Sequence, residues 1–380
     1  MHEVVQVCMS LFFMCGAITV LLASILEKYL KDIAKHEWFF FASALPTFLD
    51  IFALAFSACL KIEPRNFMRT VALLSLLGIG MMTRTSLVFI VLGRAFAGLI
   101  YSQLPFFNRL VVAFSNEHNI TRNMVYLNNS GLAGYLLAPL FLLYSENIQD
   151  ILWCCALLIT ISFCLISIWI PFYCEKEKVE KHVENDQQQS KILWIYFILL
   201  QCTLNLTGSS VFYLVSPILT FHEKSSLSIG ILFSLIVLSQ MIGNWIVFSF
   251  YSQNIGKINS LFIPIVGMSM VGLTLILTWK SVSVWLICFM ILIVSFPDSV
   301  LTVTAVRLSE KFPDPSKMLA LNGMITSCMY FLGPMMNMLF LIHPALPLCP
   351  HLFLWFATWC VHRSMSFDFQ EEEEVMSSSS

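Results

Sequence analysis

Charged residues are scarce in this sequence: only 12% of its 380 residues are Asp, Glu, Lys or Arg. A soluble globular domain carries about 25%, whereas 58% of this chain is hydrophobic. The few charges cluster in short segments, and the stretches between them approach the ~20 residues that cross ~30 Å of hydrocarbon as a helix. The composition therefore excludes a water-soluble domain and predicts an all-α integral membrane protein.

Several kinds of functional site are missing as well. The net charge is -2 and no basic patch with interleaved aromatic residues occurs, so we expect no nucleic-acid partner. No CxxC pair, HExxH motif or other His/Cys ligand spacing is present, so we expect neither a metal site nor a cofactor. Most of the twelve cysteines lie in apolar stretches, where cysteine packs as a small hydrophobe. Because catalytic constellations are also lacking, we do not expect an enzyme.

Twelve apolar stretches are candidate membrane spans. The last of them carries Pro347 and Pro350 in its first turns, where proline interferes with helix bonding, so eleven spans are the alternative. The candidate spans are Val4–Leu26, Trp38–Leu60, Phe67–Thr83, Ser86–Asn108, Met124–Tyr144, Ile151–Tyr173, Ile192–Leu219, Ser228–Tyr251, Leu261–Trp279, Val282–Thr304, Met318–Ile342 and Leu346–Val361.

The most polar interruption, Cys174–Lys191, falls near the middle of the chain and leaves six candidate spans on either side. Its composition is typical of a solvated linker. We therefore predict an N-terminal six-helix bundle (residues 1–173), a linker (174–191) and a C-terminal six-helix bundle (192–363). Residues 364–380 hold a run of glutamates followed by serines, and we expect a disordered tail because like charges repel.

Lysine and arginine in the short loops are more frequent on the side that holds both ends of the chain. The positive-inside rule then predicts cytoplasmic termini and a cytoplasmic linker. The sequence leaves open whether the membrane is the plasma membrane or an endolysosomal one.

The fifth and eleventh spans resemble each other. Parallel duplicated halves are a recurrent plan of transporters, which bind substrate near the bilayer midplane between the halves. The aligned pairs are Met124–Asn128 with Met318–Asn322, Tyr135 with Tyr330, and Ala138–Pro139 with Gly333–Pro334.

These residues resemble the major facilitator superfamily, and within it the drug–proton antiporter and lysosomal branch. The fourth span carries Arg94 and Gly98, similar to the family's Arg-x-x-x-Gly signature on that span. Gly134–Pro139 is similar to its Gly-x-x-x-Gly-Pro element, with alanine in place of the second glycine. The signature Gly-x-x-x-Asp-x-x-Gly-Arg of the loop after span two is degraded, with Ser57, Lys61, Pro64 and Arg65 at its four positions.

The resemblance implies two bundles in a pseudo-twofold arrangement, with spans one, four, seven and ten lining a central cavity. It places Arg94 and Asp298 there, beside Gln201 and Asn205. Placing an ionisable side chain deep in a bilayer costs roughly 2.5–3.5 kcal/mol of free energy, so each such residue is expected to have a structural or functional role. Arg94 then attracts an anionic solute group or influences a proton-carrying carboxylate; the alternative is a structural arginine bound to backbone carbonyls. Asp298 is a proton carrier or faces an aqueous vestibule without a special role.

Asp50 is assigned a structural role first and solute or proton binding second, because span two normally supports the cavity in this family. Buried amides such as Asn128 and Asn322 usually bond neighbouring helices, with cavity contact as the minority alternative. Small residues and prolines let helices approach and bend, which suits either gating or simple close packing. The residues of this kind are Gly98, Gly131, Gly134, Pro139, Gly333 and Pro334.

We therefore predict a secondary active transporter that moves a small organic solute by alternating access, coupled to protons and acting as a monomer in the bilayer. The degraded loop signature and the sparse charge leave an alternative, a non-transporting relative that acts as a membrane receptor or scaffold. A pore is disfavoured because no ring of like residues or filter-like loop is visible.

Overall fold

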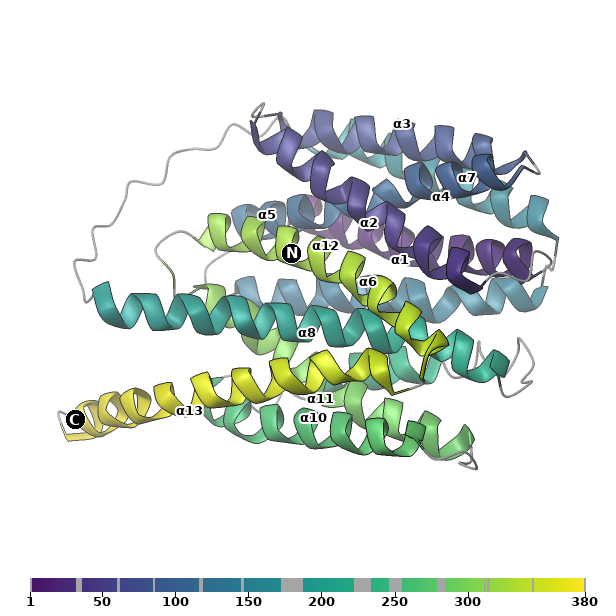
Figure 1. Ribbon diagram of the computed structural model, residues 1–380. Coiled ribbons are helices and arrows are strands. Elements are labelled where there is room, and N and C mark those ends of the chain that lie inside the picture. Colours follow the sequence, from purple (N-terminus) through teal and green to yellow (C-terminus); the bar gives the residue numbers. More distant parts are fainter. Residues whose placement is uncertain are drawn as a thin grey trace.

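The protein is a bundle of long helices (Figure 1). We describe it from a computed structural model, which covers residues 2–31, 36–59, 62–84, 86–115, 119–144, 147–171, 187–221, 234–245, 255–278, 284–310, 312, 315–343 and 345–378. Its elements are α1 (Glu3–Lys31), α2 (His36–Cys59), α3 (Pro64–Met82), α4 (Leu87–Gly98), the 3-10 helix η1 (Leu99–Gln103), α5 (Leu104–Phe114), α6 (Ile120–Tyr144), α7 (Ile148–Trp169), α8 (Gln187–Phe221), a helical stretch at 234–245, α10 (Ile255–Thr278), α11 (Val284–Glu310), α12 (Pro315–Asn337), the short η3 (Met338–Leu341) and η4 (Leu346–Leu348), and α13 (Cys349–Ser378).

The predicted all-α architecture is confirmed, and the described residues contain no strand. Counted over these residues, with α4, η1 and α5 taken as one interrupted span, the helices form twelve segments. Large apolar side chains cover their outer surface: Trp153 is 73% exposed, Trp285 77% and Phe353 72%. Exposed apolar surface on this scale suits a lipid environment, where helices also satisfy their own backbone groups. Within the described residues, five stretches are apolar and long enough to cross a membrane by length and composition alone: Glu3–Ala23, Leu87–Phe114, Ile148–Trp169, Ile192–Val211 and Ile258–Leu277.

The two halves of the chain repeat one packing scheme. In the first half, α1 packs on α6, and α3 packs on both α4 and α7. In the second half, α8 packs on α12, and α10 packs on both α11 and α13. Each pair in one half thus has its counterpart six spans later, which is the arrangement of two six-helix bundles related by a pseudo-twofold axis.

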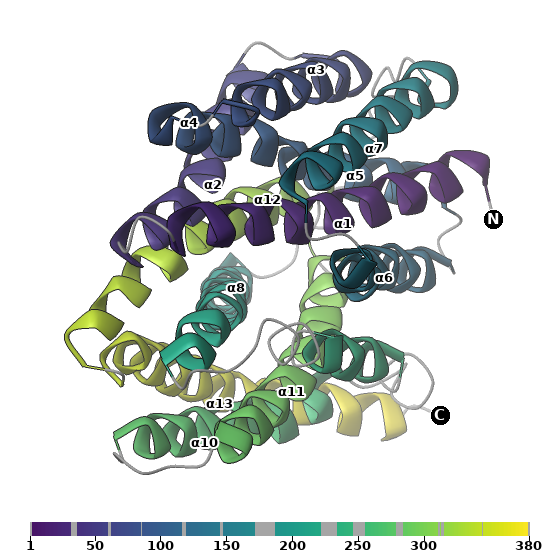
Figure 2. The same ribbon diagram turned by 90° about the vertical axis from the view of Figure 1, so that its right-hand side faces the viewer.

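Each half has its own apolar core. One cluster of buried side chains runs from Val4 to Ile170, and a second runs from Tyr196 to Met365. Figure 2 shows the purple-to-blue helices of the first half gathered above α10, α11 and α13 of the second. Among the described residues, contacts between the halves are made mainly by α12, which packs on α2 and α5, and a hydrogen bond joins the 234–245 helix to α6.

The fourth span is interrupted, whereas the sequence predicts one helix over Ser86–Asn108. Its α-helix ends at Gly98, a five-residue 3-10 segment follows, and α5 begins at Leu104. Pro105 explains the break, because proline lacks the N–H that an α-helix would direct to the carbonyl of Tyr101. The proline instead occupies the first turn of α5, where an N–H is not required.

The last span forms in spite of its prolines. Pro347 lies in the short η4 and Pro350 is the second residue of α13, so both occupy first turns that need no N–H donor. The helix then continues to Ser378. Residues 364–378 are therefore helical, where the sequence predicts a disordered tail. Glutamate is a good helix former, and an apolar helix directly before it removes the cost of starting a new one.

Candidate functional site

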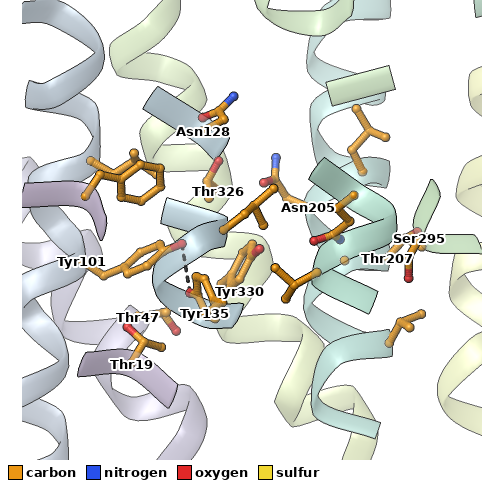
Figure 3. A pocket seen from close by; sticks show the side chains of 18 of the residues that line it. Thr19, Thr47, Tyr101, Asn128, Tyr135, Asn205, Thr207, Ser295, Thr326 and Tyr330 are labelled. Carbon is orange, nitrogen blue, oxygen red and sulfur yellow. Dashed lines mark hydrogen bonds between the residues drawn. The ribbon is translucent and has the colours of Figure 1, made fainter. Parts of the chain in front are cut away.

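A cavity lies between the two halves and encloses about 1770 Å³ of empty space, including the part that is open to its surroundings. Side chains from α1, α2, α4, η1, α5 and α6 line it on one side, and side chains from α8, 234–245, α11 and α12 on the other. Figure 3 shows part of this lining, with Tyr101 and Tyr135 of the first half pointing toward Tyr330 of the second. Of the described residues that line the cavity, only Asp50 and Arg94 are charged.

Arg94 reaches the cavity from α4, although its side chain is only 3% exposed. Gly98, one turn later, makes room for it. A Cβ on Gly98 would lie 2.3 Å from Cβ of Pro46 and 2.8 Å from Nη1 of Arg94. The missing side chain at position 98 thus lets α2 approach α4 and leaves the guanidinium between them.

Asp50 also lines the cavity, and it does so from α2, which the sequence analysis treats as a supporting span. Ser43, Thr47 and Asp50 recur at helical spacing, so one face of α2 points into the cavity. Asp50 is 1% exposed and interacts electrostatically with Arg94. Its Oδ1 atom accepts no hydrogen bond from the described residues. A membrane-buried carboxyl and a guanidinium therefore share one wall of the cavity.

Gln201 and Asn205 line the opposite wall from α8. The Asn205 amide donates from Nδ2 to the backbone carbonyl of Gln201 at 2.8 Å and to its Oε1 at 3.2 Å. These two bonds use the donors of Asn205 and leave its carbonyl oxygen as the acceptor for a ligand. Further along the helix, Thr207 lines the cavity while its hydroxyl accepts a bond of 2.9 Å from Nε1 of buried Trp355.

Asp298 belongs to α11, whose residues Val294 and Ser295 line the cavity. The side chain of Asp298 lies outside the described residues. The predicted role of this carboxyl in the cavity therefore stays a prediction.

The glycines singled out in the sequence lie at close helix contacts. Cβ atoms on Gly131 and Gly134 would lie 2.6 Å from the Phe12 ring and 2.1 Å from the carbonyl oxygen of Phe13, both on α1. A Cβ on Gly333 would lie 2.1 Å from the Ser209 hydroxyl on α8. Pro139 and Pro334 lie inside α6 and α12, the same two helices. These contacts fit the close packing that small residues allow between membrane helices.

Arg65, which stands at the arginine position of the degraded loop signature, joins α3 to α7. Its Nη2 donates to the backbone carbonyl of Ser167, and Arg69 donates from Nε to the Ser167 hydroxyl at 2.9 Å. Both arginines lie in the first turns of α3, so this pair fixes the start of α3 to the end of α7.

Several cavity residues were not among the predicted binding residues. Tyr135 donates a hydrogen bond of 3.1 Å to the Tyr101 hydroxyl, and Tyr330 lines the cavity beside them (Figure 3). Asn128 and Asn322 line the same cavity. Their position therefore agrees with cavity contact, the less favoured of the two alternatives that the sequence offered for these amides. Tyr135 and Tyr330, like Asn128 and Asn322, are aligned pairs of the internal repeat. The repeat was therefore the signal that could have found them.

A family model for the major facilitator superfamily matches residues 7–336. The chain belongs to the major facilitator superfamily. It is accordingly a membrane transporter by family, which agrees with its cavity shared between two bundles. No curated protein matches this major facilitator chain. Within the described residues, no group of three His, Cys, Asp or Glu side chains could hold a metal ion.

Solved structures support the same fold. The human organic anion transporter MFSD10 (TETRAN) matches with a TM-score of 0.70 and 15% identity over 94% of this chain and 98% of its own. A bacterial homologue of the iron transporter ferroportin, in an outward-facing state, gives 0.71 and 14% over 96% and 100%. A variant of the Escherichia coli fucose:proton symporter FucP gives 0.65 and 12% over 94% and 97%. At these identities, the similarity shows that this major facilitator protein shares the fold of these structures and no more.

Proposed function

We propose that this protein is a secondary active transporter that carries a small organic anion together with a proton, by alternating access of the cavity between the two halves. The observation that carries the proposal is the Asp50–Arg94 pair, the charged groups of the described cavity lining. The fold accommodates both parts of the proposal, because its structural neighbours include an organic anion transporter and a proton symporter.

Alternating access requires that the halves move as units around a fixed site. Each half has its own core, and α12 packs across the boundary on α2 and α5. Asn244 donates to Oδ1 of Asn129 at 3.0 Å, while Phe48 and Phe331 pack with their ring centroids 5.3 Å apart. Because α6 and α12 are equivalent, Phe331 lies roughly 12 Å further along the bundle than the level of Asn129. Contacts at two levels allow closure on one side while the other opens.

The charge pair supplies a mechanism for coupling. When Asp50 is ionised, its negative carboxylate balances the positive charge of Arg94 on the same wall of the cavity. When Asp50 takes up a proton, Arg94 is left to pair with an anionic group of the solute, since a buried charge needs a partner. Solute anion and proton then cross together with no net charge, and release of the proton restores the Asp50–Arg94 interaction.

Flux measurements on the purified protein in liposomes test this proposal. A panel containing lactate, benzoate, glucose and choline would be offered with and without an imposed pH gradient, and empty liposomes of the same lipid give the background. We expect an organic acid to accumulate when the gradient is applied. Arg94→Ala should abolish this uptake, whereas Asp50→Asn should lose accumulation driven by protons but retain exchange of solute for solute.

Matched variants control for loss of folding and surface charge. Arg84 and Asp150 are exposed residues at helix ends, so Arg84→Ala and Asp150→Asn should transport like the wild type. Transport that never exceeds the background for any member of the panel would contradict the proposal and favour a receptor or scaffold. Proton-driven uptake by the Asp50→Asn variant equal to that of the wild type would show that Asp50 does not take part in coupling.

A further inference from the structure

Among the polar residues that line the cavity, one carboxamide and one phenol of each half occupy equivalent positions. Asn128 and Tyr135 come from α6, and Asn322 and Tyr330 come from α12. In each helix the two residues are about two turns apart, so both can face the same space. The site therefore reflects the internal duplication of the chain. Each half contributes an asparagine and a tyrosine that line the cavity opposite those of the other half.

The tyrosines of the two halves meet at the level of η1. Tyr135 donates to the Tyr101 hydroxyl at 3.1 Å, and Tyr330 from the opposite half lines the cavity beside them (Figure 3). Phe12 packs edge-on against Tyr101, with ring centroids 6.2 Å apart, and it lines the cavity as well. Figure 3 shows the three phenols gathered in the middle of the cavity. Aromatic rings thus bound this space from α1, η1, α6 and α12.

The surrounding wall mixes aliphatic side chains with many polar ones. Some of its polar groups are held in fixed positions, as Asn205 is by its two bonds to Gln201. Small-molecule sites combine apolar surface with placed polar groups that fix the orientation of the ligand. The aliphatic residues of the lining include Leu104, Leu132, Leu204, Val211, Ile236 and Val237.

Arg94 lies on the same wall as Tyr101, two turns earlier. The separation along the helix is roughly 12 Å, counting the longer rise of the 3-10 residues. An extended arginine side chain and an anion the size of benzoate together span such a distance. A carboxylate held by Arg94 would therefore carry an attached ring to the tyrosines.

We propose that the solute is an aryl carboxylate, whose flat ring is held between Tyr135 of one half and Tyr330 of the other. This proposal rests on the proposed function and specifies the substrate of the same site. Offset-stacked and edge-to-face contacts favour an aromatic ring over a saturated one of equal size. Because the two tyrosines belong to different halves, they grip the ring together only when the cavity closes around it. Ring recognition thus favours the closed state, as a ligand that binds one state better shifts the population toward it.

Binding of a matched pair of acids to the purified protein in detergent tests the ring site without requiring transport. Benzoate and cyclohexanecarboxylate are both anions at neutral pH and both carry a six-membered ring, but only benzoate is flat and aromatic. We expect benzoate to bind about two- to tenfold more tightly by isothermal titration. Tyr135→Leu and Tyr330→Leu should each reduce this preference, whereas Tyr135→Phe and Tyr330→Phe should keep it.

Tyr126 provides the control, since it lies on α6 but is 40% exposed and is not part of the cavity lining. Tyr126→Leu should leave the preference for benzoate unchanged. Equal affinity for the two acids, no binding of either, or a preference that survives in the Tyr135→Leu/Tyr330→Leu double variant would overturn the proposal. Tighter binding of benzylamine than of benzoate would overturn its carboxylate part. Proton-driven flux of a non-aromatic acid without any ring preference would leave the transporter standing while refuting the ring site.

Discussion

Replacing Gly134 with alanine tests the packing of α6 on α1. The new Cβ would lie 2.1 Å from the carbonyl oxygen of Phe13 and 2.9 Å from the amide nitrogen of Ala17, whereas ordinary Cβ contacts begin at 3.4 Å. Both neighbours are backbone atoms, so no side chain can turn aside and the two helices must separate by about 1 Å. A gap of this size forfeits a quarter to a half of the dispersion energy of each affected contact. We expect a loss of about 1–3 kcal/mol, the usual cost of overpacking.

For a bundle of this size, the predicted loss corresponds to a thermal midpoint lowered by roughly 2–10 °C. Intrinsic fluorescence during heating of the purified protein in detergent would measure it. Gly80→Ala is the matched control, because a Cβ on Gly80 would meet nothing within 4 Å. That variant should gain up to about 1 kcal/mol from the better helix propensity of alanine. Equal midpoints for Gly134→Ala and Gly80→Ala would refute the assigned contact between α6 and α1.

Two further substitutions test the buried polar contacts. Asn259 donates to the Tyr196 hydroxyl at 2.8 Å and accepts from Thr304 at 2.7 Å. Asn259→Leu leaves the phenol without this partner, so it should lower the free energy of unfolding by about 1–3 kcal/mol, measured by thermal unfolding. Tyr196→Phe should restore part of that loss, and a double variant no more stable than the single one would contradict the explanation. Asn244→Ala removes the hydrogen bond of 3.0 Å to Asn129 that joins the two halves. Such bonds are worth about 0.6 kcal/mol in membranes. The population in which the halves are separated near Asn244 should therefore rise about threefold. Distances between genetically encoded labels would detect the shift, and an unchanged distribution would count against this link.

Much of the fold could be predicted because its main determinant is the length of apolar stretches. The predicted span Phe67–Thr83 corresponds to α3 at Pro64–Met82, and Ile151–Tyr173 to α7 at Ile148–Trp169. A helix that crosses hydrocarbon must satisfy its backbone within the segment, so length and hydropathy carry most of the information. Pro105 allowed a kink in the fourth span to be predicted, but not the 3-10 segment after Gly98, because an apolar sequence looks the same in an α-helix and in a 3-10 helix.

The direction in which a polar side chain faces was harder to predict. Asn128 faces the cavity, whereas Asn259 bonds to neighbouring helices, yet both are asparagines in apolar surroundings. Asp50 was assigned to a supporting helix because the family pattern describes whole spans rather than the faces of each span. Its position depends on the contact of Pro46 with Gly98, between residues far apart in the sequence. Only the internal repeat contained information on faces, since it marked Tyr135 and Tyr330 as equivalent.

The 3-10 segment at Leu99–Gln103 divides the fourth span into two helical registers. Each of its five residues turns the chain by about 120° instead of about 100°, which adds roughly 100° over the segment. Leu104 therefore points within about 20° of the direction of Arg94, whereas a continuous α-helix would turn it about 80° away. A helical wheel drawn through the whole span would misplace every residue from Leu104 onward by more than a quarter turn. Cross-linking or accessibility scans of this span should be interpreted with one phase up to Gly98 and another from Leu104 onward.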